Sequence, residues 1–182
     1  PDGSILEMES GVNGFDIAEK ISPSLAKAAL AVTVNGKTQD LSTPITTDAT
    51  VTIITAKDKE GLDILRHSCS HLMAEAIQEL WKDVQVTIGP SIENGFYYDF
   101  ARKEPFTTED FAKIEAKMHE IVKRDEKVER SVWKREDAIK HFKDIGEHYK
   151  AEIIEDLPES ETITMYKQGN FMDLCRGPHV PS

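Results

Sequence analysis

The sequence predicts an α+β protein of two small domains, because short β-branched runs alternate with helix-periodic segments along its 182 residues. Its 39% hydrophobic and 30% charged residues are ordinary for a chain that folds around one or two cores. A polar stretch at residues 55–61 separates a β-branched run from a helical pattern, which is typical of a linker. We therefore expect a first domain at residues 1–57 and a second at residues 58–182.

The first domain is predicted to combine a helix with a small sheet. The apolar spacing of residues 15–21 indicates a helix, which should end at Ser22-Pro23 because a residue before proline avoids the helical conformation. Residues 31–34 and 51–54 are β-branched and predict strands. Asn35-Gly36 follows the first of them and favours a tight hairpin turn.

The start of the sequence suggests half of another hairpin. A turn at residues 1–4 is followed by a segment at residues 5–8 that we expect to be a strand. Its partner would have to precede the turn. We therefore expect that the sequence begins a few residues inside its first domain.

The second domain is predicted to open with a long helix at residues 62–81. His67 and His71 lie on the same side of this helix as the small residues Ser70 and Ala74, so a neighbouring group can approach them closely. The opposite side forms an apolar stripe that we expect to face a core, made of Leu62, Leu65, Cys69, Leu72, Met73, Ala76 and Leu80.

The remaining elements follow from the same kinds of signal. Thr107 and Asp110 match the capping box that begins a helix, and the next apolar residues keep helical spacing. The further expected elements are strands at 84–88 and 96–100, a helix from 108 to 122, a strand at 128–133, a helix at 135–143, and strands at 162–166 and 171–175.

Composition excludes several classes of protein. The 22 basic and 33 acidic residues give a net charge of −11, which argues against nonspecific nucleic-acid binding by counterion release, so an RNA partner would need a locally basic surface or other domains. We expect a cytoplasmic protein without a membrane segment, and its two cysteines as thiols rather than a disulfide. Phosphate-loop, serine-elbow and dinucleotide motifs do not occur in the sequence.

Two polar clusters carry possible chemistry. The spacing of His67 and His71 places two imidazoles one helical turn apart, although such a pair is equally typical of a solvated helix face. Asp173, Cys175 and His179 bring a carboxylate, a thiol and an imidazole into one short segment. Gly and Pro between the last two prevent a continuous helix, so a turn can aim all three side chains inward.

Two interpretations of these clusters remain open from the residues alone. His67, His71, Cys175 and His179 have the ligand types of a tetrahedral zinc site, with water taking one position in a hydrolase. Alternatively, the same side chains form a metal-free polar pocket that orients water. Cys175 alone would be read as a buried apolar thiol.

Other candidate residues give weaker signals. Lys150 has the pattern of a solvated surface lysine, and Tyr98 fits a core as well as a pocket. Gly89 can break a strand or allow a close backbone approach. The histidines without a partner pattern, which we expect at the surface, are His119, His141 and His148.

Several segments together resemble a known family. Residues 16–18, 24–27, 34–36 and 53–56 resemble the small TGS module, and residues 67–72, 88–90, 94–99 and 173–181 resemble the editing domain of the threonyl-tRNA synthetase family. The resemblance implies a ubiquitin-like β-grasp domain followed by an editing domain with an antiparallel sheet and packed helices. The family's catalytic and anticodon-binding motifs are not in this sequence, so we expect no aminoacylation and an editing domain truncated at its end.

The resemblance implies hydrolysis of seryl-tRNA(Thr). By the family's pattern, His67 and Asp173 would position or polarise water and the ribose hydroxyl, and Lys150 would stabilise developing negative charge. His71, Cys175 and His179 would complete the pocket, with Gly89 and Tyr98 along the substrate. A similar residue set holds zinc in alanyl-type editing domains, but the threonyl branch implies no required cofactor. ATP and the catalytic-domain zinc belong to the parts that are absent here.

The resemblance also implies partners. We expect the 3′ end of tRNA(Thr) and the remaining synthetase domains, with neither membrane nor DNA. The fragment should be monomeric and the full-length protein a homodimer. The alternatives are a noncatalytic RNA-binding or regulatory module and a zinc-dependent alanyl-type deacylase.

Overall fold

The computed structural model describes residues 3–182 and divides into two compact units. The first contains the described residues up to Leu65 together with Gly177–Pro181, and the second contains Arg66–Arg176 together with Ser182. The division therefore falls inside a helix, later than the position after Lys57 that the polar linker suggested. The physical reason is that Ile64, on the first turns of this helix, packs with Ala31 and Ile54 of the first unit.

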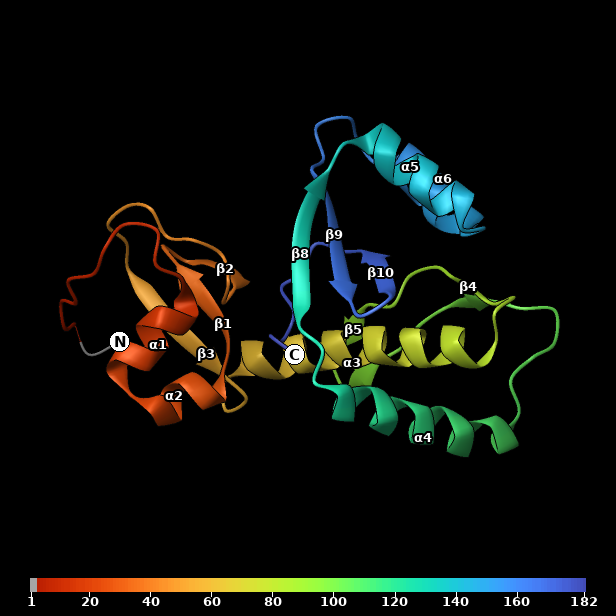
Figure 1. Cartoon of the computed structure of the whole chain (residues 1–182), viewed down its shortest axis with the longest axis horizontal. Helices are drawn as coiled ribbons and strands as arrows, with labels where there is room; N and C mark the ends of the chain where they lie inside the picture. Colours follow the sequence, from red (N-terminus) through yellow and green to blue (C-terminus); the bar gives the residue numbers. More distant parts are fainter. Residues whose placement is uncertain (1–2) are drawn as a thin grey trace. The chain divides into compact units, whose positions relative to one another are not determined.

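The first unit is a small antiparallel sheet with helices on it (Figure 1). Its elements are α1 (Gly14–Ile21), α2 (Pro23–Ala28), β1 (Ala29–Val34), β2 (Lys37–Asp40) and β3 (Val51–Thr55), and the strand order is β2-β1-β3. On central strand β1, Val32 packs with Ala18 of α1, while its neighbour Ala31 joins the cluster around Ile54 and Ile64. Alternation along one strand thus places apolar contacts on both faces of the sheet.

Local signals in the first unit produced the predicted elements. Asn13 caps α1 and forms a capping box with Asp16, and the predicted end of the helix at Ser22 is confirmed. Ser22 also caps α2, whose first residue is Pro23, a helix that we did not predict. The hairpin turn is confirmed as well, because Asn35 and Gly36 both have positive φ angles, 49° and 81°.

The strand predicted at residues 5–8 is wrong. This segment has no regular structure, and the side chain of Ile5 is 93% exposed. A strand needs a hydrogen-bonding neighbour, and central strand β1 already has β2 on one side and β3 on the other. The turn predicted at residues 1–4 lies partly outside the described residues.

The second unit is also mixed, with α3 and α4 along one another and α5 and α6 as a pair (Figure 1). The sheet order β10-β9-β8 is antiparallel, and two further pairs, β4-β7 and β5-β6, are short. The elements are α3 (Lys59–Leu80), β4 (Gln85–Val86), β5 (Ser91–Ile92), β6 (Gly95–Phe96), β7 (Phe100–Ala101), α4 (Thr108–Arg124), β8 (Val128–Trp133), α5 (Arg135–Asp144), α6 (His148–Asp156), β9 (Ile163–Gln168) and β10 (Phe171–Leu174).

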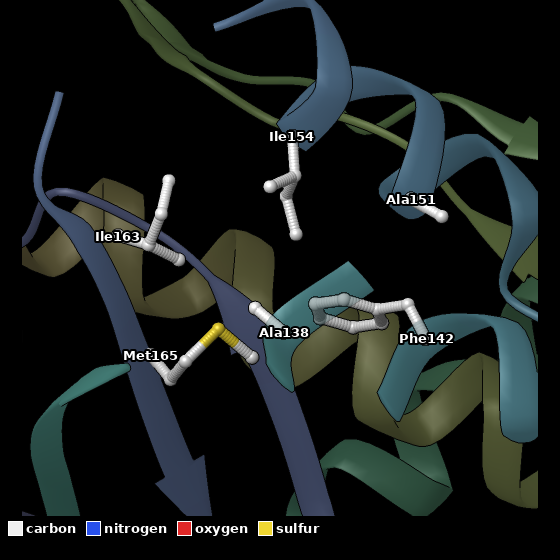
Figure 2. Close-up of a cluster of buried hydrophobic side chains, with 6 residues drawn as sticks. All are labelled: Ala138, Phe142, Ala151, Ile154, Ile163 and Met165. Carbon is white, nitrogen blue, oxygen red and sulfur yellow. The ribbon is translucent and has the colours of Figure 1, made fainter. Parts of the chain in front are cut away.

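The register of β10 sends neighbouring side chains to different surroundings. Met172 and Leu174 pack against the cluster formed by α5, α6 and β9, which Figure 2 shows, with Phe142, Ile154 and Met165 at its centre. Phe171 instead packs with Ala74 of α3 and with Tyr98. Asp173 shares the face of Phe171 because side chains alternate along a strand. The sheet therefore carries an apolar core on one face and presents a carboxylate on the other.

The apolar stripe predicted for the long helix is confirmed only in part: Ala76 is buried, and Met73 and Leu80 pack on an apolar cluster. Leu62 is 44% exposed, whereas Ser70, His71, Ala74 and Ile77, outside that stripe, are buried. Apolar periodicity did not find this face because polar side chains on it are buried through specific partners, described below. None of the helices in the described part of the chain has the length and apolar character needed to cross a membrane.

Candidate active site

A buried ion pair joins the edge of the sheet to the start of α6. The Nζ atom of Lys150 contacts Oδ1 of Asp173, with the two residues 2% and 1% exposed. Lys150 also donates to the phenol oxygen of Tyr98 at 3.2 Å, and Tyr98 in turn donates to Oδ2 of Asp173 at 2.7 Å. These three side chains form a closed hydrogen-bonded ring, which we call the Lys–Asp–Tyr ring. Burial and the Asp173 charge raise the pKa of Tyr98 well above its usual value, so the phenol stays protonated as a donor.

Asp173 has further contacts that occupy its oxygens. Its Oδ1 atom accepts the backbone N–H of Leu174 at 2.8 Å, and Nδ1 of His71 lies 3.5 Å from Oδ2. A buried carboxylate is stable only where its charge is paired and its oxygens accept hydrogen bonds. The Asp173 carboxylate meets this condition, and this explains why Lys150 can be buried with it.

The second group of polar residues consists of His67, His71 and Cys175. Nε2 of His67 lies 2.8 Å from Sγ of Cys175, and the two imidazole rings lie 4.9 Å apart in an edge-on arrangement. One ligand atom from each of the three residues lies within 4.8 Å of the others. The predicted meeting of the long helix with the Asp173–Cys175 segment is thus present within the second unit.

Both histidines of this group are held neutral near pH 7. Burial lowers the pKa of His67, and Asp173 only partly opposes this. Burial lowers the pKa of His71 well below its usual value, and the nearby His67 and Lys150 act in the same direction. A neutral imidazole has a lone pair that can accept a proton. The site therefore contains a base beside a fixed ammonium group.

Gly89 brings a loop close to this site. A Cβ atom at Gly89 would lie 2.1 Å from Cδ2 of Tyr98, so no side chain fits there without moving the Tyr98 ring. The Gly89 carbonyl also lies 2.9 Å from the hydroxyl of buried Ser70, which is 2.7 Å from the carbonyl of His67. The close approach predicted for Gly89 thus fixes Tyr98, and Ser70 ties the loop to α3.

The ligand types of His67, His71 and Cys175 suit zinc, but the distance between His67 Nε2 and Cys175 Sγ does not. Two donors on a tetrahedral zinc stand about 3.6 Å apart when one is nitrogen and the other sulfur, given the usual bond lengths. The 2.8 Å between His67 Nε2 and Cys175 Sγ is a hydrogen-bond distance instead. The pair would have to open before it could hold a metal ion.

His179, the fourth predicted ligand, belongs to the first unit by its packing. The residue is buried, and its backbone N–H donates to Oδ1 of Asp40 at 3.0 Å. Its neighbour Val180 packs with the apolar cluster around Ile54.

The surface position expected for His141 is wrong, because this residue is half-buried against Trp133 and Phe142. The other two histidines expected at the surface, His119 and His148, are exposed.

The structure also corrects the surface position that the pattern around Lys150 suggested. Helix α6 was not predicted, and its buried residues are Lys150, Ala151 and Ile154, which lie on one helical face. Sequence reasoning likewise missed buried Glu147, for which the sequence offered no motif, and it read Ser70 only as a small residue beside the two histidines. Tyr98 proves to be both core and site, because its ring packs with Val86 while its hydroxyl bonds Asp173.

Family comparisons match both ends of the chain. Residues 1–55 match the TGS domain family, and residues 163–182 match the family described as the threonyl and alanyl tRNA synthetase second additional domain. The second match includes Asp173, Cys175 and His179.

Curated relatives match the chain from end to end. The sequence is 59% identical over all 182 residues to the threonine--tRNA ligases of Rickettsia bellii and Rhodospirillum rubrum. It is 57% identical to the ligase of Paramagnetospirillum magneticum, again over the whole chain. The chain spans 28% to 29% of the length of these relatives.

Proposed function

Because the chain corresponds over its whole length to the N-terminal region of threonyl-tRNA synthetases, we propose that its second unit hydrolyses seryl-tRNA(Thr), the mischarged product of such an enzyme. The observation that carries the proposal is the Lys–Asp–Tyr ring beside the neutral imidazole of His67. This arrangement places a proton acceptor and a fixed positive charge together, which are the groups that ester hydrolysis requires.

The selectivity follows from the chemistry of the two amino acids. Serine is smaller than threonine and keeps its hydroxyl, so a synthetic pocket gains only about 1–3 kcal/mol from the missing methyl group. A second site that admits serine and excludes threonine by contact with that methyl group supplies the remaining discrimination. We assign this task to the site of the second unit that contains the Lys–Asp–Tyr ring and His67.

The residue roles follow from their bonding. The neutral His67 ring accepts a proton from the attacking water, and Cys175 orients the ring through its contact with Nε2. Lys150 uses two of its three N–H donors for Asp173 and Tyr98, which leaves one for the oxyanion that forms on the ester carbonyl. We assign Asp173 to holding Lys150, because its oxygens already accept from Lys150, Tyr98 and Leu174. His71 lies beside Asp173, and we propose that His179 completes the pocket.

We propose that this hydrolysis needs no metal, because His67 Nε2 and Cys175 Sγ are hydrogen-bonded to each other at a separation too short for two ligands of one zinc ion. Zinc held by His67, His71, Cys175 and His179 is the alternative, and it would supply a more acidic bound water. ATP and the catalytic-domain zinc would act elsewhere in the full-length synthetase.

The partners we propose are the 3′ end of tRNA(Thr) and the remaining synthetase domains, and the proposed setting is the cytoplasm. The full-length protein would be a homodimer and this region alone a monomer. With a net charge of −11, the chain has little nonspecific affinity for RNA, so binding would depend on the tRNA contacts of the other domains.

The test compares hydrolysis of seryl-tRNA(Thr) and threonyl-tRNA(Thr) by the same protein, in the full-length synthetase and in the 182-residue chain. We expect faster hydrolysis of the seryl ester. Equal rates, or no hydrolysis by a folded full-length protein, would overturn the proposal. RNA binding that resides in the first unit and survives His67→Ala would instead favour a noncatalytic RNA-binding module.

A further inference from the structure

Glu147 ties the start of α6 to two other elements of the second unit. Its Oε2 atom accepts the backbone N–H of Val86 on β4 at 2.9 Å, and its Oε1 atom accepts from the side-chain amide of Gln78 on α3. The next residue, His148, donates its backbone N–H to the side chain of Gln85 at 3.0 Å. Glu147 is only 6% exposed. The helix is thus held at its first turn by side-chain bonds.

This attachment lies immediately before the residue that forms the buried ion pair. Lys150 stands in the first turn of α6, and the backbone carbonyl of Glu147 accepts the N–H of Ala151 at 3.3 Å. The ammonium must reach both Asp173 and Tyr98, so its position depends on where this turn is anchored. Gly146, with a φ of 84°, immediately precedes Glu147 in the connection from α5.

We infer that Glu147 is a positioning residue of this site: its carboxylate fixes the first turn of α6 against β4 and α3 and thereby places the Lys150 ammonium between Asp173 and Tyr98. The inference rests on the proposed function for its catalytic consequence. Its structural consequence, the place of Lys150, stands apart from that function and can be measured separately.

The surroundings of the carboxylate make a conservative replacement informative. Burial raises the pKa of Glu147 to about 7, although the Val86 N–H and the charge of Lys150 act in the opposite direction. A cavity of about 340 Å³ borders the same side chain and is also lined by His141 and Lys167. A glutamine can accept from Val86 and meet the Gln78 amide after that amide flips, so the hydrogen bonds can survive without the charge.

The experiment compares Glu147→Ala and Glu147→Gln in the full-length synthetase. Glu152→Ala is the matched control, because Glu152 is exposed on the same helix. Single-turnover hydrolysis of seryl-tRNA(Thr) separates the rate constant at saturating enzyme from the apparent affinity. We expect the alanine variant to lower the rate constant about tenfold or more with little change in affinity, as for a misplaced catalytic group. The glutamine variant should restore most of the rate, and the control should match the parent.

A crystal structure of each variant separates this inference from the proposed function. In Glu147→Ala we expect Lys150 to leave its contact with Asp173, and in Glu147→Gln we expect the contact to remain. An undisturbed ion pair in a folded alanine variant would overturn the inference, whatever the hydrolysis assay gives. Equal, measurable rates for an active parent and the alanine variant would also overturn it. Absent hydrolysis by the parent, with Lys150 displaced in the variant, would overturn the proposed function alone.

Gln78→Ala provides a second variant should Glu147→Ala fail to fold. It removes one of the two hydrogen bonds that the Glu147 carboxylate accepts and leaves the other, from the backbone N–H of Val86, in place. We expect a smaller loss of rate in the same direction. A rate equal to that of the parent, together with an unaltered Lys150, would count against the anchor on α3.

Discussion

Lys150 and Asp173 form an ion pair that is almost completely removed from water, although α6 and β10 hold them at separate places in the chain. Neither charge is stable there alone, because an unpaired ion in the interior loses its hydration without a counter-charge to offset that cost. The site and the stability of the second unit therefore depend on the same pair.

We predict that Asp173→Asn destabilises the second unit by about 3–5 kcal/mol, because it leaves the Lys150 ammonium buried without a counter-charge. Both tryptophans, Trp81 and Trp133, lie in the second unit, so denaturant unfolding followed by tryptophan fluorescence reports on it. The control is a double-mutant cycle with Lys150→Met and Asp173→Leu. The double variant should lose less stability than the sum of the losses in Lys150→Met alone and Asp173→Leu alone. Additive losses would contradict the assigned pairing.

Gly89→Ala should lower both stability and seryl-tRNA hydrolysis, because the added Cβ would stand 2.1 Å from the Tyr98 ring. Overpacking of this kind costs about 1–3 kcal/mol, and a displaced Tyr98 would release Asp173. Gly95→Ala is the matched control, since a Cβ there meets nothing within 4 Å. Thermal unfolding and deacylation rates of both variants decide the prediction, and equal behaviour of the two would refute it.

Glu75 should make the second unit less stable as the pH rises. Burial and the nearby Glu126 and Glu79 raise its pKa to about 7 from 4.5, while Arg124 acts in the opposite direction. The folded form therefore holds a proton that the unfolded form has lost between these two values. The contribution to stability is complete below pH 4.5 and is lost as the pH rises through about 7.

The measurement for this prediction is the unfolding free energy of Glu75→Gln and of the parent at several pH values. Glutamine carries no charge, so at pH 8 the variant should be more stable by about 1 kcal/mol, because it avoids burying a carboxylate charge near Glu126 and Glu79. The difference should disappear below pH 4.5, where Glu75 is protonated in both the folded and the unfolded states. A difference that does not vary with pH would contradict the assignment.

Removal of metal should leave the hydrolysis unchanged, because His67 and Cys175 are bonded to each other at 2.8 Å. The measurement compares deacylation before and after dialysis against a chelator, using the isolated N-terminal region so that the catalytic-domain zinc plays no part. Loss of activity that zinc restores would show that the alternative, a zinc-dependent deacylase, is correct.

Much of the fold could be predicted because its signals are local. The Asn35-Gly36 turn and the capping box of Thr107 and Asp110 depend on neighbouring residues, and both were found as predicted. The strand at residues 5–8 failed because strand formation depends on a distant partner. Helix α6 was missed because its buried face includes a charged residue, Lys150, which has no apolar signature.

The candidate site divides in the same way. The spacing of His67 and His71 and the Asp173–Cys175 segment could be read from the sequence, and the structure brings them together. The burial of Lys150 could not be read, because it depends on Asp173 and Tyr98 arriving from other elements. The anchoring carboxylate of Glu147 is invisible to pattern reasoning for the same reason.

The most direct test of the account is single-turnover hydrolysis of seryl-tRNA(Thr) by the parent and by His67→Ala, with the fold of both verified by tryptophan fluorescence. A proton acceptor in the transition state contributes about 10²–10⁴ to the rate, so we predict a loss of at least about 100-fold. A folded His67→Ala variant that hydrolyses the ester as fast as the parent would contradict the central claim.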